Sequence, residues 1–548
     1  MNLVKIGQYL LNRISEIGIK QIFGVPGDYN LEFLDDVIGH KDLEWVGSTN
    51  ELNAAYAADG YARINGIAAM ITAYGVGELS AANGNAGSFS EDVPVIHIVG
   101  VPKREVFKRH MIVHHTLGVG DRFDAFKKVF ENLTAFTVWL DAKNAINQID
   151  HAIKCAVFYK KPVYIMLPVD VAQFHVSCNQ NPISFGSWFD MKEHQQIISD
   201  LEKKLNNAKQ AVIISGHKVI RYGLVNDLNK FITNNNINVV TTGFGKGSVD
   251  ETNPMYAGLY YGEKTTDEAI KKMVDTADLI LTIGNKFSDI TSSNFHLGFD
   301  KNNVFEISDT HVKYDDKLFT NHSFGYLVKS LANMKFNYSG LSVFGEPSIE
   351  MFVPQENKTL NYDRLFIALN DFIKEDDIVV SDVGTVIYLA QYLNLKKNCQ
   401  FIMQPLWASI GFSFPAAIGA KFANQNKRVV NIIGDGAFNM TFNEIGTAIW
   451  KKINMVVFVL NNKGYTIEKL IHGLEEPYND IALVDYCKLV KAFDTNNDRS
   501  LVFSVTNETE LKNAIDVVTN TNDKFILIEL HLDKKDYPSI MKGMYPNT

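Results

Sequence analysis

The stretch "NIIGDGAFNM" (residues 431–440) decides the fold class that this sequence predicts. A short apolar run enters Gly434, Asp435 and Gly436 without a break, and a run compatible with a helix follows. A buried strand that passes through a glycine turn into a helix is typical of parallel α/β sheets. Alone, a Gly-Asp-Gly sequence is most often only a tight turn. The rest of the chain has to decide between a turn and a functional site.

A second apolar run supports the functional interpretation. "INMVVFVL" (453–460) ends in Asn461 and Asn462, and Gly464 follows after one further residue. Aspartate and asparagine supply oxygen ligands, and a glycine lets a backbone carbonyl reach a cation. Two neighbouring strand ends of this kind predict a site for a hard cation such as Mg²⁺, with phosphate oxygens and water completing the shell. The helix that begins at Gly436 would favour the charge of a diphosphate.

The same alternation of short apolar strands and helices runs through the whole chain and predicts three doubly wound parallel-sheet α/β domains. Polar, proline-containing stretches near 171–190 and 337–360 separate the blocks. We expect domains at 1–178, 190–340 and 355–548. The apolar spacing of the first residues, from Val4 to Ile17, predicts an N-terminal helix.

Composition excludes several classes of protein. The chain has 548 residues with 46% hydrophobic and 21% charged side chains, which suits about three soluble domains. A net charge of −9 argues against a nucleic-acid partner. Four dispersed cysteines exclude a disulfide framework and indicate a reducing compartment. The apolar runs are shorter than a membrane helix, so we expect a soluble, cytoplasmic protein without a membrane partner.

The doublet in "VHHTLG" (113–118) is a candidate for proton transfer. Histidine titrates near neutrality, so His114 and His115 are either incidental or a proton-handling pair. A loop histidine pair is usually only solvated or hydrogen-bonded, and the doublet becomes informative only when the rest of the chain supplies a reaction.

Six separated motifs together supply that reaction. Gly-Asp-Gly followed at this spacing by Asn-Asn resembles the signature of thiamine-diphosphate enzymes. The six motifs resemble those of the 2-keto acid decarboxylases, the group that includes pyruvate and indolepyruvate decarboxylases. The resemblance spans nearly the whole chain. The motifs are "FGVPGDYNLEFLD", "NELNAAYAADGYAR", "GVGELSAANG", "VHHTLGVGD", "PLWASIGFSFPAAIGA" and "NNKGYTIEKLIHG".

The resemblance implies a thiamine diphosphate and Mg²⁺ site between a pyrimidine-binding first domain and a diphosphate-binding third domain. Glu51 matches the glutamate that hydrogen-bonds the aminopyrimidine, although a glutamate at a helix start also has a purely structural role. Ile410 matches the bulky residue that bends the cofactor, and Ala408 stands where glycine is common and offers a backbone oxygen. The metal ligands implied are Asp435, Asn462 and Gly464, and the further cofactor contacts are Thr385, Gly434 and Gly436.

By the same resemblance, the acids and bases around the reacting carbon are Asp28, His114, His115 and Glu468, together with Glu51. Decarboxylation needs several of them, since an alkoxide, a carbanion and a hydroxyl each exchange a proton while water is excluded. The cofactor is the electron sink. For Glu468, the alternative is a surface Glu-Lys pair on a helix.

The resemblance also implies a substrate pocket formed by Val383, Ile387, Tyr388 and Ile467, with a C-terminal helix near 540–544. Pyruvate-selective members tend to place a large aromatic residue where Ile387 stands. We therefore expect a broad range of branched-chain, aromatic and aliphatic 2-keto acids. A pyruvate-selective enzyme, or another thiamine-diphosphate carboligase, remains the alternative, because one methylene discriminates by only about 1–3 kcal/mol.

Other classes fit less well. Acetolactate synthesis would share the metal motif but lacks the histidine doublet, and a nicotinamide fingerprint at Gly75 and Gly77 fails at Ser80. A silent homologue would be expected to lose Glu51 or Asp435, and neither is missing. In the family the cofactor lies between two chains. The resemblance therefore implies a homodimer at minimum and a homotetramer built from two dimers.

Overall fold

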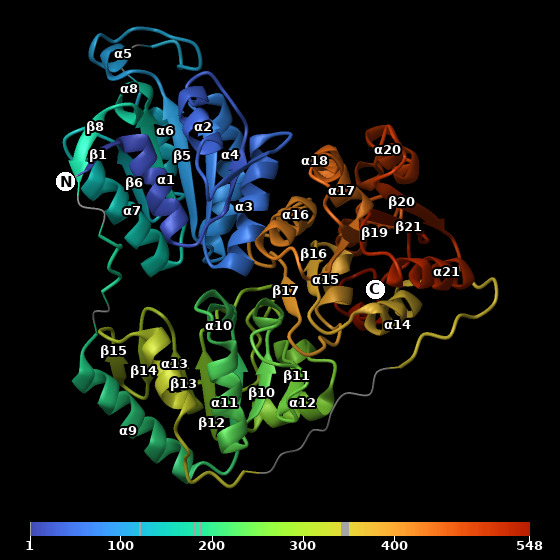
Figure 1. Cartoon of the computed structure of the whole chain (residues 1–548). Helices are drawn as coiled ribbons and strands as arrows, with labels where there is room; N and C mark the ends of the chain where they lie inside the picture. Colours follow the sequence, from blue (N-terminus) through green and yellow to red (C-terminus); the bar gives the residue numbers. More distant parts are fainter. Residues whose placement is uncertain (1, 120–121, 179–180, 187–188, 341–349) are drawn as a thin grey trace.

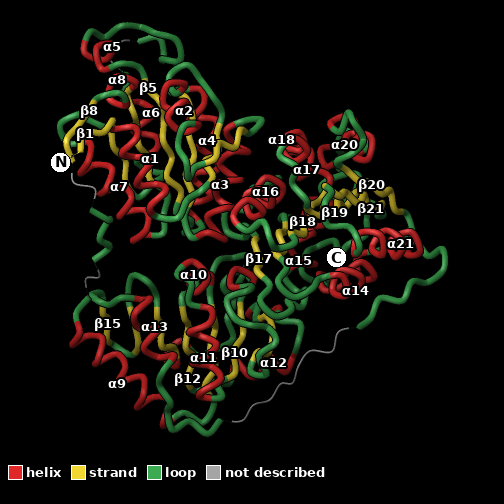
Figure 2. The backbone as a smooth tube through the Cα atoms, in the orientation of Figure 1, coloured by secondary structure: helices red, strands yellow, loops and turns green. Residues whose placement is uncertain are grey.

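The computed structural model covers residues 1–548 and describes all of them except 1, 120–121, 179–180, 187–188 and 341–349. Three mainly parallel sheets follow one another along the chain, each covered by helices (Figures 1 and 2). We call the units built around these sheets the first, middle and third domains. The limits drawn from the sequence at 178, 190, 340 and 355 stay predictions, and part of each linker lies outside the described residues.

The first sheet is fully parallel and has the order β3-β2-β4-β5-β7-β6. Residues that alternate along its strands enter two different apolar clusters, so both faces of the sheet are buried. Its strands are β2 (Gln21–Gly24), β3 (Glu44–Gly47), β4 (Ala68–Ala73), β5 (Val95–Val101), β6 (Phe136–Trp139) and β7 (Val163–Pro168). Its helices are α1 (Ile6–Glu16), α2 (Leu31–Ile38), α3 (Glu51–Asn65), α4 (Val76–Ser90), α5 (Arg104–Lys108), α6 (Ala125–Phe130), α7 (Ala145–Tyr159) and α8 (Val169–Ala172).

The middle sheet has the order β11-β10-β9-β12-β13-β14-β15. Its strands are β9 (Ala211–Ser215), β10 (Asn238–Thr241), β11 (Tyr256–Leu259), β12 (Leu279–Ile283), β13 (Val304–Ile307), β14 (Val312–Tyr314) and β15 (Lys317–Phe319). Its helices are α9 (Met191–Asn207), α10 (His217–Arg221), α11 (Val225–Asn235), α12 (Glu268–Asp275) and α13 (Phe324–Ala332).

The third sheet is again fully parallel, with the order β17-β16-β18-β19-β21-β20. Its strands are β16 (Ile378–Ser381), β17 (Gln400–Ile402), β18 (Val429–Gly434), β19 (Met455–Asn461), β20 (Ser500–Val505) and β21 (Phe525–His531). Its helices are α14 (Tyr362–Phe372), α15 (Thr385–Ala390), α16 (Ser413–Ala423), α17 (Asp435–Thr441), α18 (Ile445–Trp450), α19 (Thr466–Ile471), α20 (Tyr486–Phe493) and α21 (Glu508–Thr519). The prediction of three doubly wound α/β domains is confirmed.

Three local expectations were wrong. Val4 lies in a strand, β1 (Asn2–Lys5), which pairs antiparallel with β8 (His175–Cys178), and the helix starts only at Ile6. The middle sheet ends in two antiparallel strands, because a tight turn at 308–311 returns the chain beside β13. Near 540–544 the chain forms only a 3-10 turn (Ser539–Met541) after Pro538, and not a longer helix.

Helix α3 crosses α16, and this contact joins the first and third domains. Two glycines allow it. A Cβ atom on Gly60 would lie 2.1 Å from the carbonyl oxygen of Ala416, and one on Gly419 would lie 1.8 Å from that of Ala57. The two helix backbones therefore touch, and one apolar cluster runs from the first sheet into the third.

Asp92 joins the first domain to the middle domain. Its buried carboxylate accepts hydrogen bonds from His217 Nε2 at 2.7 Å and Lys286 Nζ at 3.0 Å, and pairs with Lys161 at 2.5 Å. Burial alone would raise the pKa of Asp92, but the His217 hydrogen bond and the lysines outweigh it and hold the pKa far below its usual range.

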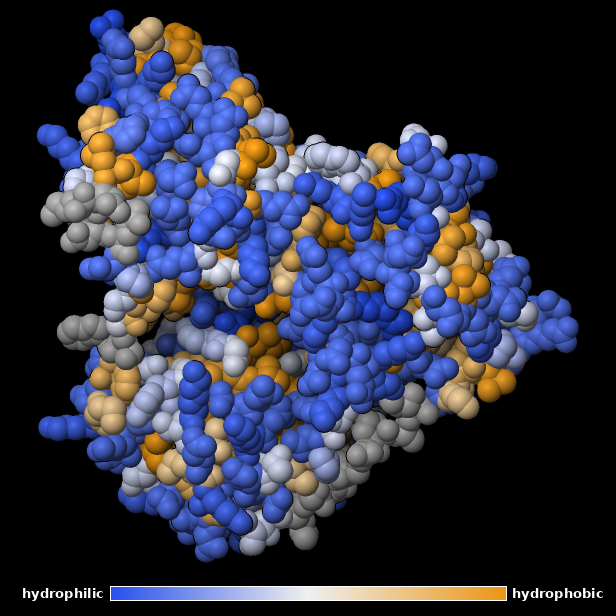
Figure 3. Space-filling view, in the orientation of Figure 1, coloured by the Kyte–Doolittle hydropathy of each residue, from blue (hydrophilic) through white to orange (hydrophobic). Residues whose placement is uncertain are grey.

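A cavity of about 2250 Å³ lies beside this junction, lined by residues of the first and middle domains that include Lys161, Lys286 and Tyr326. The hollow is visible in Figure 3. None of the candidate site residues lines it. In the part of the chain that the structure describes, no helix combines the length and apolar character needed to cross a membrane.

Candidate active site

The candidate residues follow the carboxyl ends of parallel strands, as expected for doubly wound sheets. In the first domain, Asp28 follows β2, Glu51 begins the helix after β3, and the histidine doublet lies in the connection after β5. In the third domain, Asp435 directly follows β18 and Asn462 directly follows β19. The candidates thus form a first-domain group and a third-domain group.

The third-domain group centres on the Asp435 carboxylate, which is 2% exposed. Its Oδ1 accepts the Gly436 N–H at 2.7 Å and its Oδ2 accepts the Lys463 N–H at 2.6 Å. Burial raises the pKa of Asp435 to about 6, against the opposing effect of the backbone hydrogen bonds. Tyr465 packs on Gly436 so closely that a Cβ there would lie 2.5 Å from its ring.

The side chain of Asn462 lies close to this carboxylate and to the Gly464 carbonyl. The side-chain oxygen of Asn462 lies 3.3 Å from Asp435 Oδ1 and 3.0 Å from the Gly464 carbonyl oxygen. The amide nitrogen of Asn462 donates to Thr466 Oγ1 at 2.7 Å and to Tyr362 Oη at 3.3 Å. Turning the amide over would let its nitrogen donate hydrogen bonds to both Asp435 and Gly464. One orientation therefore presents an oxygen to these two residues, and the other presents an N–H donor. With the amide oxygen on this side, Asn462, Asp435 and Gly464 supply oxygen ligands of the kind that a hard cation takes.

Around this loop lie supporting residues that sequence reasoning missed. Tyr362, fully buried on α14, shares a hydrogen bond with Thr385 Oγ1 at 2.9 Å and so links that candidate to Asn462. Its place a hundred residues before Asn462 leaves no signal in the sequence pattern.

The turn that carries Ala408 and Ile410 is held by a buried acid. Asp382 accepts N–H groups from Gly411 at 3.2 Å and Ser413 at 2.9 Å. Ala408 has a positive φ of 55°, the left-handed region that glycine enters without a Cβ penalty. The structure therefore explains why glycine suits position 408. Asp382 was missed, although it directly precedes the candidate Val383.

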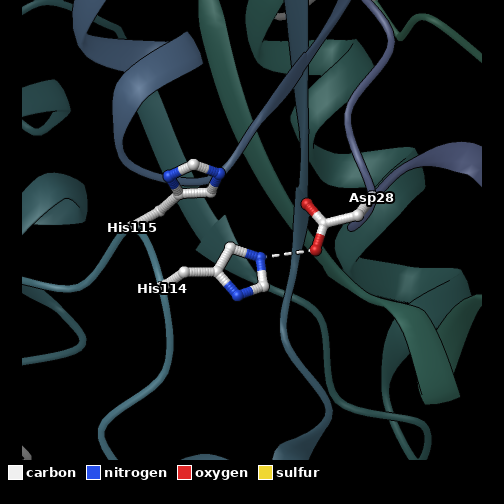
Figure 4. Close-up of side chains that lie close together, drawn as sticks. All are labelled: Asp28, His114 and His115. Atoms are coloured by element: carbon white, nitrogen blue, oxygen red, sulfur yellow. Dashed lines mark hydrogen bonds and ion pairs between the residues drawn. The ribbon is translucent and has the colours of Figure 1, made fainter.

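In the first-domain group, Asp28, His114 and His115 lie together (Figure 4). His114 Nε2 lies 2.5 Å from Asp28 Oδ2, and the two histidine rings are 4.7 Å apart. Tyr29 stacks on His114 at 4.8 Å with nearly parallel rings. This tyrosine was also missed, although it is the next residue after Asp28 in the "GDYN" motif.

The turn at Gly75 packs against the backbone of His115. The backbone of His115 is in the left-handed region with φ 65°, and a Cβ on Gly75 would lie 2.4 Å from the His115 carbonyl oxygen. Strained backbone of this kind persists where surrounding structure enforces it, commonly at functional sites.

Glu51 lies in the first turn of α3, behind the N-cap Asn50, whose side chain accepts the Asn53 N–H at 2.8 Å. Its carboxylate oxygen lies 3.2 Å from the point where a Cβ on Gly77 would stand. Glycine at 77 therefore leaves the space that the carboxyl group occupies.

The pocket candidates belong to one apolar cluster of the third domain. Ile387 and Tyr388 are buried in it, while Val383 and Ile467 pack at its edge. Ile467 approaches the Gly384 turn, where a Cβ would lie 3.8 Å from its Cγ2. The Tyr388 hydroxyl is hydrogen-bonded to that of Tyr545 in the C-terminal segment. Val383, Ile387 and Ile467 thus present aliphatic side chains within this cluster, and the Tyr388 hydroxyl is already partnered.

Among the described residues, no hydrogen bond or ion pair joins the first-domain group to the third-domain group. Glu468, at α19, makes no such contact with Asp28, His114 or His115. In Figure 1 the loop beside α5 lies far from α17 and β19. Within one chain the loop beside α5 is thus separate from the loop at Asp435, whereas Glu51 stands between Thr49 and Asn53, whose side chains bond Glu444 and Asn443 of the third domain.

Comparison with known proteins identifies the family to which the domains belong. Three family models of thiamine pyrophosphate enzymes match the chain: the N-terminal TPP binding domain at residues 4–119, the central domain at 198–320 and the C-terminal TPP binding domain at 382–530. Both groups of candidate residues belong to connections within or beside the two TPP binding matches.

Curated relatives match almost end to end. An alpha-keto-acid decarboxylase from Mycobacterium leprae is 36% identical, covering 98% of this chain and 95% of the relative. Pyruvate decarboxylase isozyme 1 from Saccharomyces cerevisiae is 34% identical, covering 98% and 97%.

A solved thiamine diphosphate-dependent 4-hydroxybenzoylformate decarboxylase from Rhodococcus jostii superposes with a TM-score of 0.80 over 97% of this chain and 99% of the other, at 19% identity, which shows the shared fold. Sheets, site halves and relatives agree: the chain belongs to the thiamine-diphosphate-dependent 2-keto acid decarboxylases.

Proposed function

We propose that this enzyme releases an aldehyde and CO₂ from 2-keto acids with branched-chain, aromatic or aliphatic side chains, using Mg²⁺ and thiamine diphosphate. The aliphatic pocket wall of Val383, Ile387 and Ile467 carries the proposal of a broad range. The relative named for alpha-keto acids and those named for pyruvate both support decarboxylation of a 2-keto acid. Selectivity for pyruvate is the second candidate.

The metal part of the proposal rests on the donor set. The Asn462 amide oxygen lies 3.3 Å from Asp435 Oδ1 and 3.0 Å from the Gly464 carbonyl oxygen, and a hard cation accepts such oxygens. With Mg²⁺ present, the Asn462 orientation with its nitrogen toward Thr466 and Tyr362 is the stable one, since the oxygens no longer repel each other. We expect the cation also to keep Asp435 ionised at neutral pH, because it offsets the burial that raises the pKa.

Thiamine diphosphate fits the remaining features. Glu51, with the space left by Gly77, would hold the pyrimidine, while the Ala408 carbonyl and the Ile410 side chain would fix its conformation. Thr385, Gly434 and Gly436 would contact the diphosphate end. Once bound, the cofactor supplies the electron sink that makes loss of CO₂ possible.

The chain's own acids and bases would then move protons. The close pair Asp28 and His114, with Oδ2 and Nε2 facing each other, would exchange a proton with a substrate oxygen. His115 lies beside them as a second donor or acceptor. Glu468 would approach from the third domain and serve the carbon that must be protonated after CO₂ has left.

A complete site needs two chains. Among the described residues no hydrogen bond or ion pair joins the two groups in one chain, so we propose a homodimer in which each site takes one group from each protomer, with two dimers forming a tetramer. Exposed large apolar side chains lie near both groups and suit such an interface; they are Val76, Leu79, Met111, Ile112, Leu117, Trp407 and Met440.

A cytoplasmic location is part of the proposal. The cysteines whose side chains are described, Cys155, Cys399 and Cys487, are free thiols, which suits a reducing compartment.

The decisive experiment compares kcat/KM for pyruvate, 2-ketoisovalerate, phenylpyruvate and indolepyruvate with Mg²⁺ and thiamine diphosphate. We expect the larger acids to be preferred. Ile387→Phe should narrow the pocket and shift the ratio toward pyruvate by about tenfold, the effect of a little over 1 kcal/mol. Val517→Phe, which adds the same ring on exposed α21, is the control and should leave the ratio unchanged.

A strong preference of the unmodified enzyme for pyruvate would establish the second candidate instead. If none of the four acids yields aldehyde although the cofactor is bound, the proposed reaction is wrong.

A further inference from the structure

The first-domain group has a second chemical property besides proton transfer. One ligand atom from each of Asp28, His114 and His115 lies within 4.8 Å of the others. Two imidazoles and one carboxylate form a ligand set that transition metals prefer, whereas Mg²⁺ prefers oxygens alone. The oxygen cluster at Asp435 has the opposite preference. The ligand sets of the two groups therefore suit different classes of metal ion.

The three side chains are held in place before any metal arrives. Tyr29 stacks on the His114 ring, and its hydroxyl lies 3.4 Å from His114 Nδ1, which leaves Nε2 directed at Asp28. Asn30 fixes the loop that carries Asp28, since its side-chain oxygen accepts the Gly27 N–H at 2.9 Å. Such outer partners orient metal-binding histidines.

In the single chain, the side chains that would bind the metal are partly exposed. The side chains of Asp28 and His114 are 48% and 56% exposed. Tetrahedral zinc has ligands roughly 3.3 Å from one another, given bonds of about 2.0–2.1 Å. Side-chain rotation toward this spacing separates Asp28 from His114 slightly and draws His115 inward.

We propose that Asp28, His114 and His115 form an inhibitory site for Zn²⁺ or a similar transition-metal ion, distinct from the Mg²⁺ site. The ion takes one carboxylate oxygen and two ring nitrogens, replaces the proton held between Asp28 and His114, and leaves a fourth position for water. Turnover stops because these groups no longer exchange protons; this last step rests on the proposed function, whereas metal binding does not.

The test uses the holoenzyme saturated with Mg²⁺ and thiamine diphosphate. Equilibrium dialysis with Zn²⁺ in excess Mg²⁺, and the visible absorption of Co²⁺ as a probe of tetrahedral nitrogen ligation, both report binding without turnover. We expect one ion per chain, and at least tenfold weaker binding in Asp28→Asn and His115→Gln. His40→Gln removes an imidazole elsewhere in the first domain and should bind as the unmodified enzyme does. Thiamine diphosphate binding by each variant verifies that it is folded.

Zinc should also lower aldehyde release in proportion to its occupancy, and a zinc-selective chelator should restore it. Binding that persists in Asp28→Asn and His115→Gln but falls as Mg²⁺ is raised would place the ion at Asp435 and overturn the proposal, as would the absence of binding. An enzyme that binds zinc at the three residues but decarboxylates no 2-keto acid would refute the proposed function and leave this site standing.

Discussion

At the scale of single residues, Gly77 determines where the Glu51 carboxyl group can lie. A methyl group at 77 would stand 3.2 Å from Glu51 Oε1 and 3.4 Å from Thr72 Cβ, so the glutamate would have to shift by a few tenths of an ångström. We expect Gly77→Ala to lower kcat about tenfold while the fold is kept, because small misplacements of positioning groups are costly. Gly325→Ala, whose methyl meets its first neighbour only at 4.0 Å, is the control. Equal activity of the two variants would contradict a role for Glu51 placement.

Glu78 gives a pH dependence at the same scale. Its buried carboxyl accepts the Gly75 N–H at 2.7 Å and the Tyr164 hydroxyl, and burial raises its pKa from 4.5 to about 7 against these hydrogen bonds. Between those pH values the folded chain binds a proton that the unfolded chain does not. The stabilisation is complete below pH 4.5 and is lost as the pH rises through 7.

Glu78→Gln removes this titration. Between pH 5 and pH 8 the unmodified protein should lose up to about 3 kcal/mol relative to the variant. Thermal unfolding of both proteins across this range measures the change. A difference in melting temperature that does not vary with pH would show that Glu78 ionises normally in the folded chain.

At the scale of elements, the α3–α16 crossing is the contact most sensitive to added volume. Gly419→Ala would place a methyl group 1.8 Å from the Ala57 carbonyl, and backbone on both sides cannot move aside. Overpacking typically costs about 1–3 kcal/mol, and this contact should lie at the upper end. The matched change Gly446→Ala meets only the movable Phe493 ring at 3.3 Å. Differential scanning calorimetry should show a large drop in melting temperature for the first variant and little for the second.

The elements also show what the sequence could predict and what it could not. Buried parallel strands such as β18 and β19 were identified from their apolar runs, because both faces of the sheet are covered. Val4 was placed in a helix since its spacing suits one, but pairing with β8, more than 170 residues away, decides its conformation. The antiparallel β14 and β15 depend in the same way on a turn whose pairing partner lies across the sheet edge.

Local sequence motifs predict candidate site residues. Residues whose partners lie far away in the sequence carry no such motif. The motifs that contain Asp28 and the histidine doublet predict a common role for these residues, and they lie side by side in the structure. Tyr362 and Asp92 carry no comparable motif. Asp92 gains its role only when Lys161, His217 and Lys286, from two domains, gather around it.

At the scale of the whole molecule, the separation of the two residue groups leads to a prediction about assembly. If each site takes Glu51 from one protomer and Asp435 from the other, Glu51→Gln and Asp435→Asn chains are each inactive alone. A heterodimer of the two variants has one site with both defects and one site with neither. Random pairing of equal amounts makes half of the dimers heterodimers, so activity should recover to about one quarter of normal.

Co-expression of the two variants with different affinity tags, followed by purification through both tags, removes the tetramers that hold only one kind of chain. Because two unlike homodimers can still share a tetramer, the activity should reach about two sevenths of normal, slightly above that of the random mixture. Two Glu51→Gln chains carrying the same pair of tags are the control and should stay inactive. Sites built within single chains would give no recovery in either preparation, because every site would then carry one defect.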